Sequence, residues 1–386
     1  MANEVPLATA EEAAEASLLY FIEPDKAAGA FDPSSPHYPS LWGHSNFQQI
    51  EVNKQVQEIY DIDGVMLFRD FISTTPNGLE LRRRTAATTL LDTPIISVGI
   101  NPALSWDDRI TAAREHAERE GFHPVGGPKS VVCYSYPKLG LLCHSDNRRW
   151  VFDLSDRTRL EVDRPLEEAG PTELRSVNSL LSSASDESRD KDKFDSSMRE
   201  LRAARTNSLI SLESGISTLR ESQEIQILPR ITLVGQDNDH FCAVASAKMI
   251  LAFHGIEKSQ SQIAAAMNTG KDGTPSVNQP PAYEILSNNA LEAKLESRSE
   301  TSDFDNIFDD MKQNIISGHP FKMGIFGHAY AIGGYNIAHS SSGTITKFLK
   351  VYDPEPEKEG TIRWEDWNFI EKIFKNVISV RKTAIV

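Results

Sequence analysis

The sequence predicts an α+β protein in which an N-terminal α+β domain is followed by a linker and a C-terminal domain whose helices precede an antiparallel sheet. Short apolar runs separated by turn residues fill residues 45–162, and a charged, serine-rich stretch follows them. From residue 226 onward, apolar residues first recur at helical spacing and then form strand-like runs. A chain of 386 residues is long enough for two domains and a connector.

The composition argues against several classes of protein. The net charge of −15 at pH 7 disfavours a nucleic-acid partner, because phosphates would be repelled. No run reaches the roughly 18 to 20 apolar residues of a membrane span, and the acidic N-terminus lacks the basic start of a Sec signal. Three cysteines are too few for a disulfide scaffold. We therefore expect a cytoplasmic protein without a membrane span, although export by another route stays open.

The first 162 residues divide into an arm and a domain. Residues 8–22 predict a helix, and residues 31–44 predict an extended arm, so the arm covers 1–44. Within 45–162, Asp63-Gly64 indicates a hairpin. The remaining expected elements are a helix over Asp107–Gly121 and strands over Val131–Tyr136, Leu139–Cys143 and Trp150–Leu154.

Residues 163–225 are expected to connect the two domains. The segment Arg164–Lys193 is charged and serine-rich, and it contains too little apolar surface to order itself. The segment Ser196–Glu221 has apolar residues at mostly helical spacing and predicts an amphipathic helix.

The segment 234–255 carries the first chemical signal. A polar loop leads into an alanine-rich helix that begins at Cys242 and ends at Gly255. The positive end of the helix dipole favours a thiolate at that position, although an isolated cysteine there is more often a small buried residue. Gln236, six residues earlier, could donate its side-chain amide to an oxyanion, with the Cys242 backbone N–H as second donor.

Two further residues complete a candidate catalytic set. His328 opens a strand-like run, and Asp353 ends another, directly before Pro354. Adjacent antiparallel strands would bring Asp353 within reach of the His328 imidazole. We therefore expect Cys242 as nucleophile, His328 as its base and Asp353 as the residue that orients the base.

Other histidines and amides fit these roles less well. His254 lies at the far end of the Cys242 helix, roughly 18 Å away. His240 is too close in sequence to face the thiol easily, and Asn336 lies eight residues along the strand from His328. His319 and His339 are expected in loops. No metal-ligand spacing is present, so neither a metal nor a cofactor is expected.

The rest of the C-terminal domain predicts helices before strands. The expected helices cover Ser259–Met267, Ala282–Asn288 and the apolar positions from Phe304 to Ile315. Trp364 and Trp367 are expected to pack on the sheet.

These residues resemble the motifs of papain-like cysteine peptidases over 226–386. The chain is most similar to the branch of double-glycine leader peptidases and staphopain-like bacterial effectors. The matching residues, in order, are Gln236, Cys242, Gly327-His328, Gly334-Tyr335-Asn336 and Tyr352-Asp353-Pro354. One departure is Asp239-His240-Phe241, where many relatives have Asp-Cys or a Gly/Ser-Cys pair. The segment 132–140 is similar to prokaryotic proteins that carry such peptidase domains.

The resemblance implies a papain-like endopeptidase with its active site between helices and sheet. It would hydrolyse peptide bonds of a peptide or protein through an acyl-thioester on Cys242, without a cofactor. Acyl transfer or transpeptidation uses the same intermediate, and a catalytically silent binding protein is the other alternative. The N-terminal domain is expected to regulate access to the peptidase cleft by contacting it, or to recruit substrate.

Overall fold

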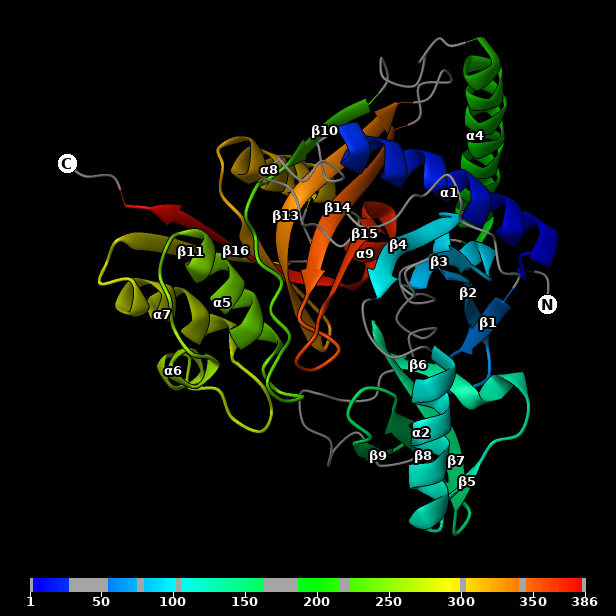
Figure 1. Ribbon diagram of the computed structural model, residues 1–386, viewed down its shortest axis with the longest axis horizontal. Coiled ribbons are helices and arrows are strands. Elements are labelled where there is room, and N and C mark those ends of the chain that lie inside the picture. Colours follow the sequence, from blue (N-terminus) through cyan, green and yellow to red (C-terminus); the bar gives the residue numbers. More distant parts are fainter. Residues whose placement is uncertain are drawn as a thin grey trace.

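The structure is a computed structural model that describes residues 3–27, 55–74, 80–101, 106–162, 187–214, 223–298, 303–339 and 345–383. It shows the expected α+β architecture (Figure 1). The described helices are α1 (Leu7–Ala27), α2 (Trp106–Arg119), α4 (Glu187–Ser214), α5 (Cys242–Phe253), α6 (Gln260–Ala266), α7 (Gln279–Leu286), α8 (Phe304–Ile316) and α9 (Trp367–Ile373).

Strands make up most of the remaining described chain. In chain order they are β1 (Gln55–Tyr60), β2 (Met66–Thr74), β3 (Glu80–Ala86), β4 (Ile95–Asn101), β5 (His123–Pro124), β6 (Val131–Ser135), β7 (Lys138–Ser145), β8 (Arg148–Asp153), β9 (Arg159–Glu161), β10 (Gln223–Ile227), β11 (Leu291–Ser297), β12 (Phe321–Ile325), β13 (His328–His339), β14 (Ile345–Asp353), β15 (Thr361–Asp366) and β16 (Phe374–Lys382).

The described strands form a single 16-stranded sheet that runs through both halves of the molecule. Its order is β11-β16-β12-β13-β14-β15-β4-β3-β2-β1-β6-β7-β8-β9, with β10 paired to β13 and β5 to β7. The junction is the antiparallel pair β15–β4, in which Trp364 lies opposite Val98. The N-terminal strands therefore continue the C-terminal sheet, and neither β4 nor β15 is left as an open edge.

The elements of the N-terminal half follow the sequence pattern closely. Gly64 turns the β1–β2 hairpin at φ +80°, a backbone conformation that glycine adopts without strain. Helix α2 and strands β6, β7 and β8 lie within about two residues of their predicted bounds. Cys133 and Cys143 are free thiols, as is Cys242. The expected extended arm, 31–44, lies outside the described residues.

Helix α4 begins inside the segment that we expected to be a charged linker. It starts at Glu187, whereas the pattern predicted a helix only from Ser196. Phe194, Met198 and Leu201 are buried, and Arg202 pairs with Glu12 of α1 at 2.9 Å. This packing orders polar residues that would not form a helix alone. The earlier part of the linker, 164–186, and the predicted helix end, 215–221, lie outside the described residues.

In the C-terminal half, α5, α6 and α7 pack on one face of the sheet and α8 and α9 on the other, and Figure 1 shows α5, α6 and α7 grouped away from the N-terminal strands. Helix α5 packs on β13, and its own residues Val244, Met249 and Ile250 are buried there. Trp364 and Trp367 are both buried in the core, as expected for packing residues. Among the described residues, no helix is long and apolar enough to cross a membrane.

Candidate active site

Cys242 is the first residue of α5, at the end where backbone N–H groups have no acceptor within the helix. Ser246, one turn later, fixes this end of the helix. Its hydroxyl contacts the carbonyl oxygens of Cys242 at 2.8 Å and of Ala329 at 3.2 Å. Because Ala329 follows His328 on β13, this contact ties α5 to the strand that carries His328.

His328 and Asp353 meet across neighbouring strands. His328 is the first residue of β13 and Asp353 is the last of β14, and the two strands pair antiparallel. The His328 Nε2 lies 2.7 Å from Asp353 Oδ1, with both side chains almost fully buried. The backbone N–H of Glu355 donates to the same oxygen at 2.8 Å. The aspartate thus contacts the Nε2 nitrogen of the imidazole and leaves Nδ1 for another partner.

The charges at this pair favour an ionised aspartate and a protonated histidine. Burial alone would raise the pKa of Asp353, but the Arg363 guanidinium and the His328 ring lower it overall. Burial would lower the pKa of His328, yet the Asp353 carboxylate and a hydrogen bond with Cys242 raise it to about 10.

The pKa of the Cys242 thiol shifts in the opposite direction. Burial tends to raise its pKa, but the hydrogen bond and charge of His328, together with Lys138 and Lys322, lower it overall. The lowered pKa of the thiol and the raised pKa of the imidazole favour a thiolate–imidazolium pair at neutral pH.

Gln236 lies in a loop that is held against the residues after Asp353. Its backbone N–H donates to the Pro354 carbonyl at 2.9 Å, and its carbonyl accepts from the Lys358 N–H at 2.8 Å. The backbone at Gly235 lies so close to residues 358–359 that a Cβ at this position would be 2.2 Å from the Glu359 nitrogen. The Gln236 side chain is fully buried, and neither of its amide atoms has a hydrogen-bond partner among the described residues. Its amide hydrogens thus have no acceptor among the described residues, and Gln236 does not itself line the cavity that contains Cys242.

Cys242 and His328 line a cavity of about 630 Å³. One wall comes from the helical part and from strands β12 and β13. The opposite wall comes from the N-terminal half and consists of Tyr134, Ser135, Lys138, Asp156, Thr158 and Leu160. The two walls approach closely beside His328, since a Cβ on Gly327 would lie 2.5 Å from Ser135 Oγ.

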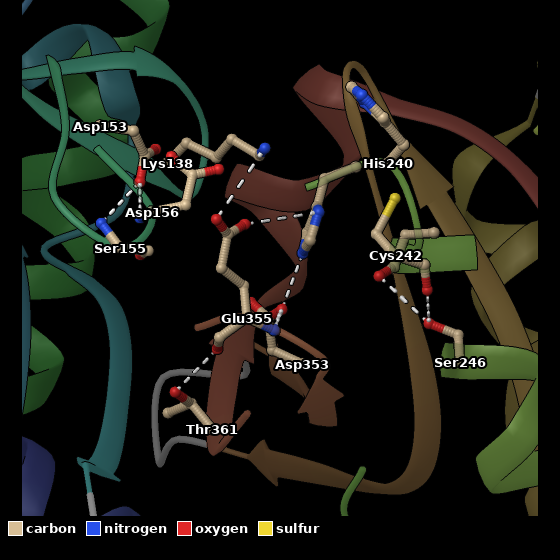
Figure 2. A network of polar contacts seen from close by, with 12 residues as sticks. Lys138, Asp153, Ser155, Asp156, His240, Cys242, Ser246, Asp353, Glu355 and Thr361 are labelled. Atoms are coloured by element: carbon tan, nitrogen blue, oxygen red, sulfur yellow. Dashed lines mark hydrogen bonds and ion pairs between the residues drawn. The ribbon is translucent and has the colours of Figure 1, made fainter. Parts of the chain in front are cut away.

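The site also contains charged residues that the sequence analysis missed. Glu355 Oε2 lies 3.8 Å from His328 Nδ1, and Glu355 Oε1 lies 3.9 Å from the Lys138 ammonium. Figure 2 shows Lys138 on one side of Glu355 and Cys242 on the other. Burial raises the pKa of Glu355 to about 7. The position of Glu355, two residues after Asp353, could have indicated that it lies near the site, whereas nothing in the sequence indicated Lys138.

The other two histidine candidates, His240 and His254, have different surroundings. His240 pairs with Asp239 at 3.1 Å and lines the cavity. His254 lies next to His319, with 6.0 Å between ring centroids, and burial lowers its pKa to about 4.

Asn336 and His339 lie farther along β13. A separation of eight residues along a strand places Asn336 about 26 Å from His328. No group of three or more possible metal ligands occurs among the described residues.

Comparisons with known proteins find similarity to one family model and to several solved structures. Residues 225–380 match the model of the Peptidase_C39 like family. No curated protein sequence matches the chain. Similar solved structures include the peptidase domain of Streptococcus ComA, a bi-functional ABC transporter involved in a quorum sensing pathway. It shares 15% identity at a TM-score of 0.29, over 40% of this chain and 100% of that one.

Two further structures are similar over the same share of the chain. A double glycine motif protease from an AMS/PCAT transporter, in complex with the leader peptide, has 19% identity and a TM-score of 0.29, over 42% of this chain and 100% of that one. UfSP from C. elegans has 18% identity and a TM-score of 0.31, over 42% of this chain and 35% of that one. The match to the Peptidase_C39 like family model thus covers residues 225–380, the part of the chain that carries Cys242, His328 and Asp353.

Proposed function

We propose that this protein is a cysteine endopeptidase that cleaves a peptide or protein through an acyl-thioester on Cys242. The observation that carries the proposal is the buried 2.7 Å contact between His328 Nε2 and Asp353 Oδ1, on a histidine that lines the same cavity as Cys242 and lowers the pKa of its thiol. A histidine that is oriented by a carboxylate and lies beside a thiol is the arrangement that nucleophilic catalysis needs.

Each residue has a distinct role in the proposed reaction. The Cys242 thiolate adds to the substrate carbonyl, and His328 gives its proton to the leaving amine. Water, deprotonated by His328, then hydrolyses the thioester. Asp353 keeps the imidazole in position, and its charge stabilises the imidazolium. The Cys242 N–H and the Gln236 side-chain amide would donate to the oxyanion.

We further propose that the N-terminal half is a fixed wall of the substrate cleft and recruits substrate there. Its contacts with the C-terminal half support this role. Tyr136 donates to Glu365 at 3.0 Å, and Phe68 packs edge-on against Phe369 at 5.8 Å. Since these contacts accompany the β15–β4 strand pairing, separating the halves would expose buried surface. Of the two roles expected, recruitment thus has more support than reversible covering of the cleft.

Peptide-library profiling of the full-length protein against Cys242→Ala tests the proposal. We expect cleavage only with the intact thiol and labelling of Cys242 by a thiol-directed probe. Mass analysis of products, with and without an added amine, separates hydrolysis from acyl transfer. Absence of any product, combined with binding of peptides by both forms, would instead support a binding protein.

A further inference from the structure

Lys322 places a buried ammonium group at the catalytic cavity. It lies on β12, the strand next to β13, and its side chain is 2% exposed. Both Lys322 and Cys242 line the cavity. The ammonium donates to Asn376 Oδ1 at 3.3 Å, and among the described residues no carboxylate forms an ion pair with it. The opposite charge that acts on it is the Cys242 thiolate.

The surroundings of Lys322 hold its ammonium in a defined place. Gly324 and Asn376 lie opposite each other in the β12–β16 pair, and Lys322 precedes Gly324 by two residues on the same face. A Cβ on Gly324 would lie 2.6 Å from Asn376 Oδ1 and 3.1 Å from Lys322 Nζ. The absent side chain at Gly324 is therefore what leaves room for the ammonium and its acceptor.

Asn376 is itself oriented by the helical part of the domain. Its Nδ2 donates to Ser276 Oγ at 3.0 Å, which turns Oδ1 toward Lys322. Ser276 and Asn376 both line the cavity. The hydrogen-bonded series Ser276–Asn376–Lys322 thus spans the base of the cleft from the helical part to the sheet.

The other two lysines at the cavity differ from Lys322. Lys138 pairs with Glu355 at 3.9 Å, and Lys375 is exposed. A buried ammonium with only a neutral amide as partner lowers the stability of the fold, and burial lowers the pKa of Lys322 to about 8. A methionine would fill the same space without that cost, so the charge itself has a use at the cavity, either toward the Cys242 thiolate or toward a ligand of opposite charge.

We propose that Lys322 is a specificity-determining residue that binds a carboxylate of the substrate next to the scissile bond. The carboxylate belongs to an acidic side chain or to a chain terminus, and both present the same charged oxygens to the ammonium. The inference deepens the proposed peptidase function and rests on it. The acidic residues that line the cavity, Asp156, Asp239 and Asp272, would repel such a group, so Lys322 defines where it can bind.

The first test uses alkylation of Cys242 in the full-length protein and needs no peptide cleavage. Iodoacetate carries a carboxylate and iodoacetamide does not, while both are displaced at carbon by the thiolate with loss of iodide. We expect Lys322→Met to lower the ratio of iodoacetate to iodoacetamide rates by about tenfold, because the local concentration of the anion falls. Lys294→Met, which removes an exposed lysine that pairs with Glu296 and does not line the cavity, should leave the ratio unchanged.

The same ratio separates the proposal from a role in activating the thiol. If Lys322 only lowered the pKa of Cys242, both rates would fall together in Lys322→Met and their ratio would stay constant. That result in a folded variant overturns the proposal. Lys322→Arg keeps the charge and should keep most of the ratio. If Lys322→Met does not fold, the same comparison is made between Lys322→Arg and Lys322→Gln.

The second test identifies the source of the carboxylate. Peptides in matched pairs, Glu against Gln at each position around the cleaved bond and a free against an amidated C-terminus, are compared by kcat/KM. We expect one acidic form to be preferred at least about tenfold by the wild type and the preference to disappear in Lys322→Met. Cleavage without any acidic preference, with an unchanged alkylation ratio, refutes the proposal and leaves the peptidase function intact. If no peptide is cleaved, the peptidase function fails and the alkylation ratio alone decides on Lys322.

Discussion

Arg363 contacts Asp353 on the carboxylate oxygen that does not contact His328, with 2.6 Å between Arg363 Nη1 and Asp353 Oδ2. The same guanidinium pairs through Nε with Glu365, which accepts a hydrogen bond from Tyr136 of the N-terminal half. Arg363 lies on β15, the strand that pairs with β4. Asp353, which contacts His328, is therefore held in place from the junction between the two halves.

Replacing Arg363 by methionine should impair the proposed reaction by raising the pKa of Asp353. Arg363 is the main favourable charge that lowers this pKa, so its loss allows Asp353 to protonate at higher pH and release the imidazolium. We expect the acid limb of kcat/KM to move to higher pH, with a decrease of about tenfold to a hundredfold near pH 6. Arg381→Met, which removes contacts to Asn314 far from the site, is the matched control. An unchanged acid limb in a folded Arg363→Met protein would contradict the assigned role.

The sequence was informative where function depends on neighbouring positions along the chain. The alanine-rich helix beginning at Cys242 and the strand ends at His328 and Asp353 follow from local patterns, and the structure brings His328 and Asp353 together. Arg363 and Lys138 could not be predicted in this way. The place of Arg363 depends on the β15–β4 pairing, and the role of Lys138 depends on its contact with Glu355; each joins positions more than 200 residues apart in sequence.

The same distinction explains the errors at the linker. Composition measures what a segment can bury by itself, and residues 187–193 contain only charged residues and one serine. They are helical because Phe194 and Met198 pack into the core and because Lys193 pairs with Asp92 at 3.2 Å. Such support from a distant part of the chain is absent from any local pattern.

Gln236→Ala should lose turnover without losing stability. The buried Gln236 amide has no hydrogen-bond partner among the described residues, so truncation breaks no such bond in the free protein. During reaction, loss of one oxyanion donor lowers kcat on the order of 10²-fold. Gln260→Ala is a useful contrast, because Gln260 braces the same loop through Gly235 and Asp237 and its loss should lower the melting temperature. Normal kcat in Gln236→Ala together with a lower melting temperature would indicate a purely structural glutamine.

His328→Ala should raise the pKa of the Cys242 thiol. In the intact site, the hydrogen bond and the charge of His328 oppose the effect of burial on that pKa. Without the ring, burial dominates, and the rate of alkylation by iodoacetamide should rise only at more alkaline pH. The pH dependence of this rate in wild type, His328→Ala and His254→Ala provides the measurement, with His254 as a histidine outside the site. Coinciding profiles for wild type and His328→Ala would show that the ring does not activate the thiol.

Glu355→Gln should remove a pH-dependent loss of stability. Burial raises the pKa of Glu355 from 4.5 to about 7 in the folded protein, so folding favours its protonated form. The stabilisation of that protonated form is fully present below pH 4.5 and is lost as the pH rises through 7. The difference in unfolding free energy between wild type and Glu355→Gln should therefore change by up to about 3 kcal/mol between pH 4 and pH 8, in favour of the variant at pH 8. Urea unfolding at both pH values measures it, and Glu359→Gln, an exposed partner of Arg109, controls for the loss of a surface charge. A difference in unfolding free energy that stays constant with pH would mean that Glu355 ionises as easily in the folded chain as in the unfolded one. Burial would then not raise the pKa of Glu355 beside the His328 ring.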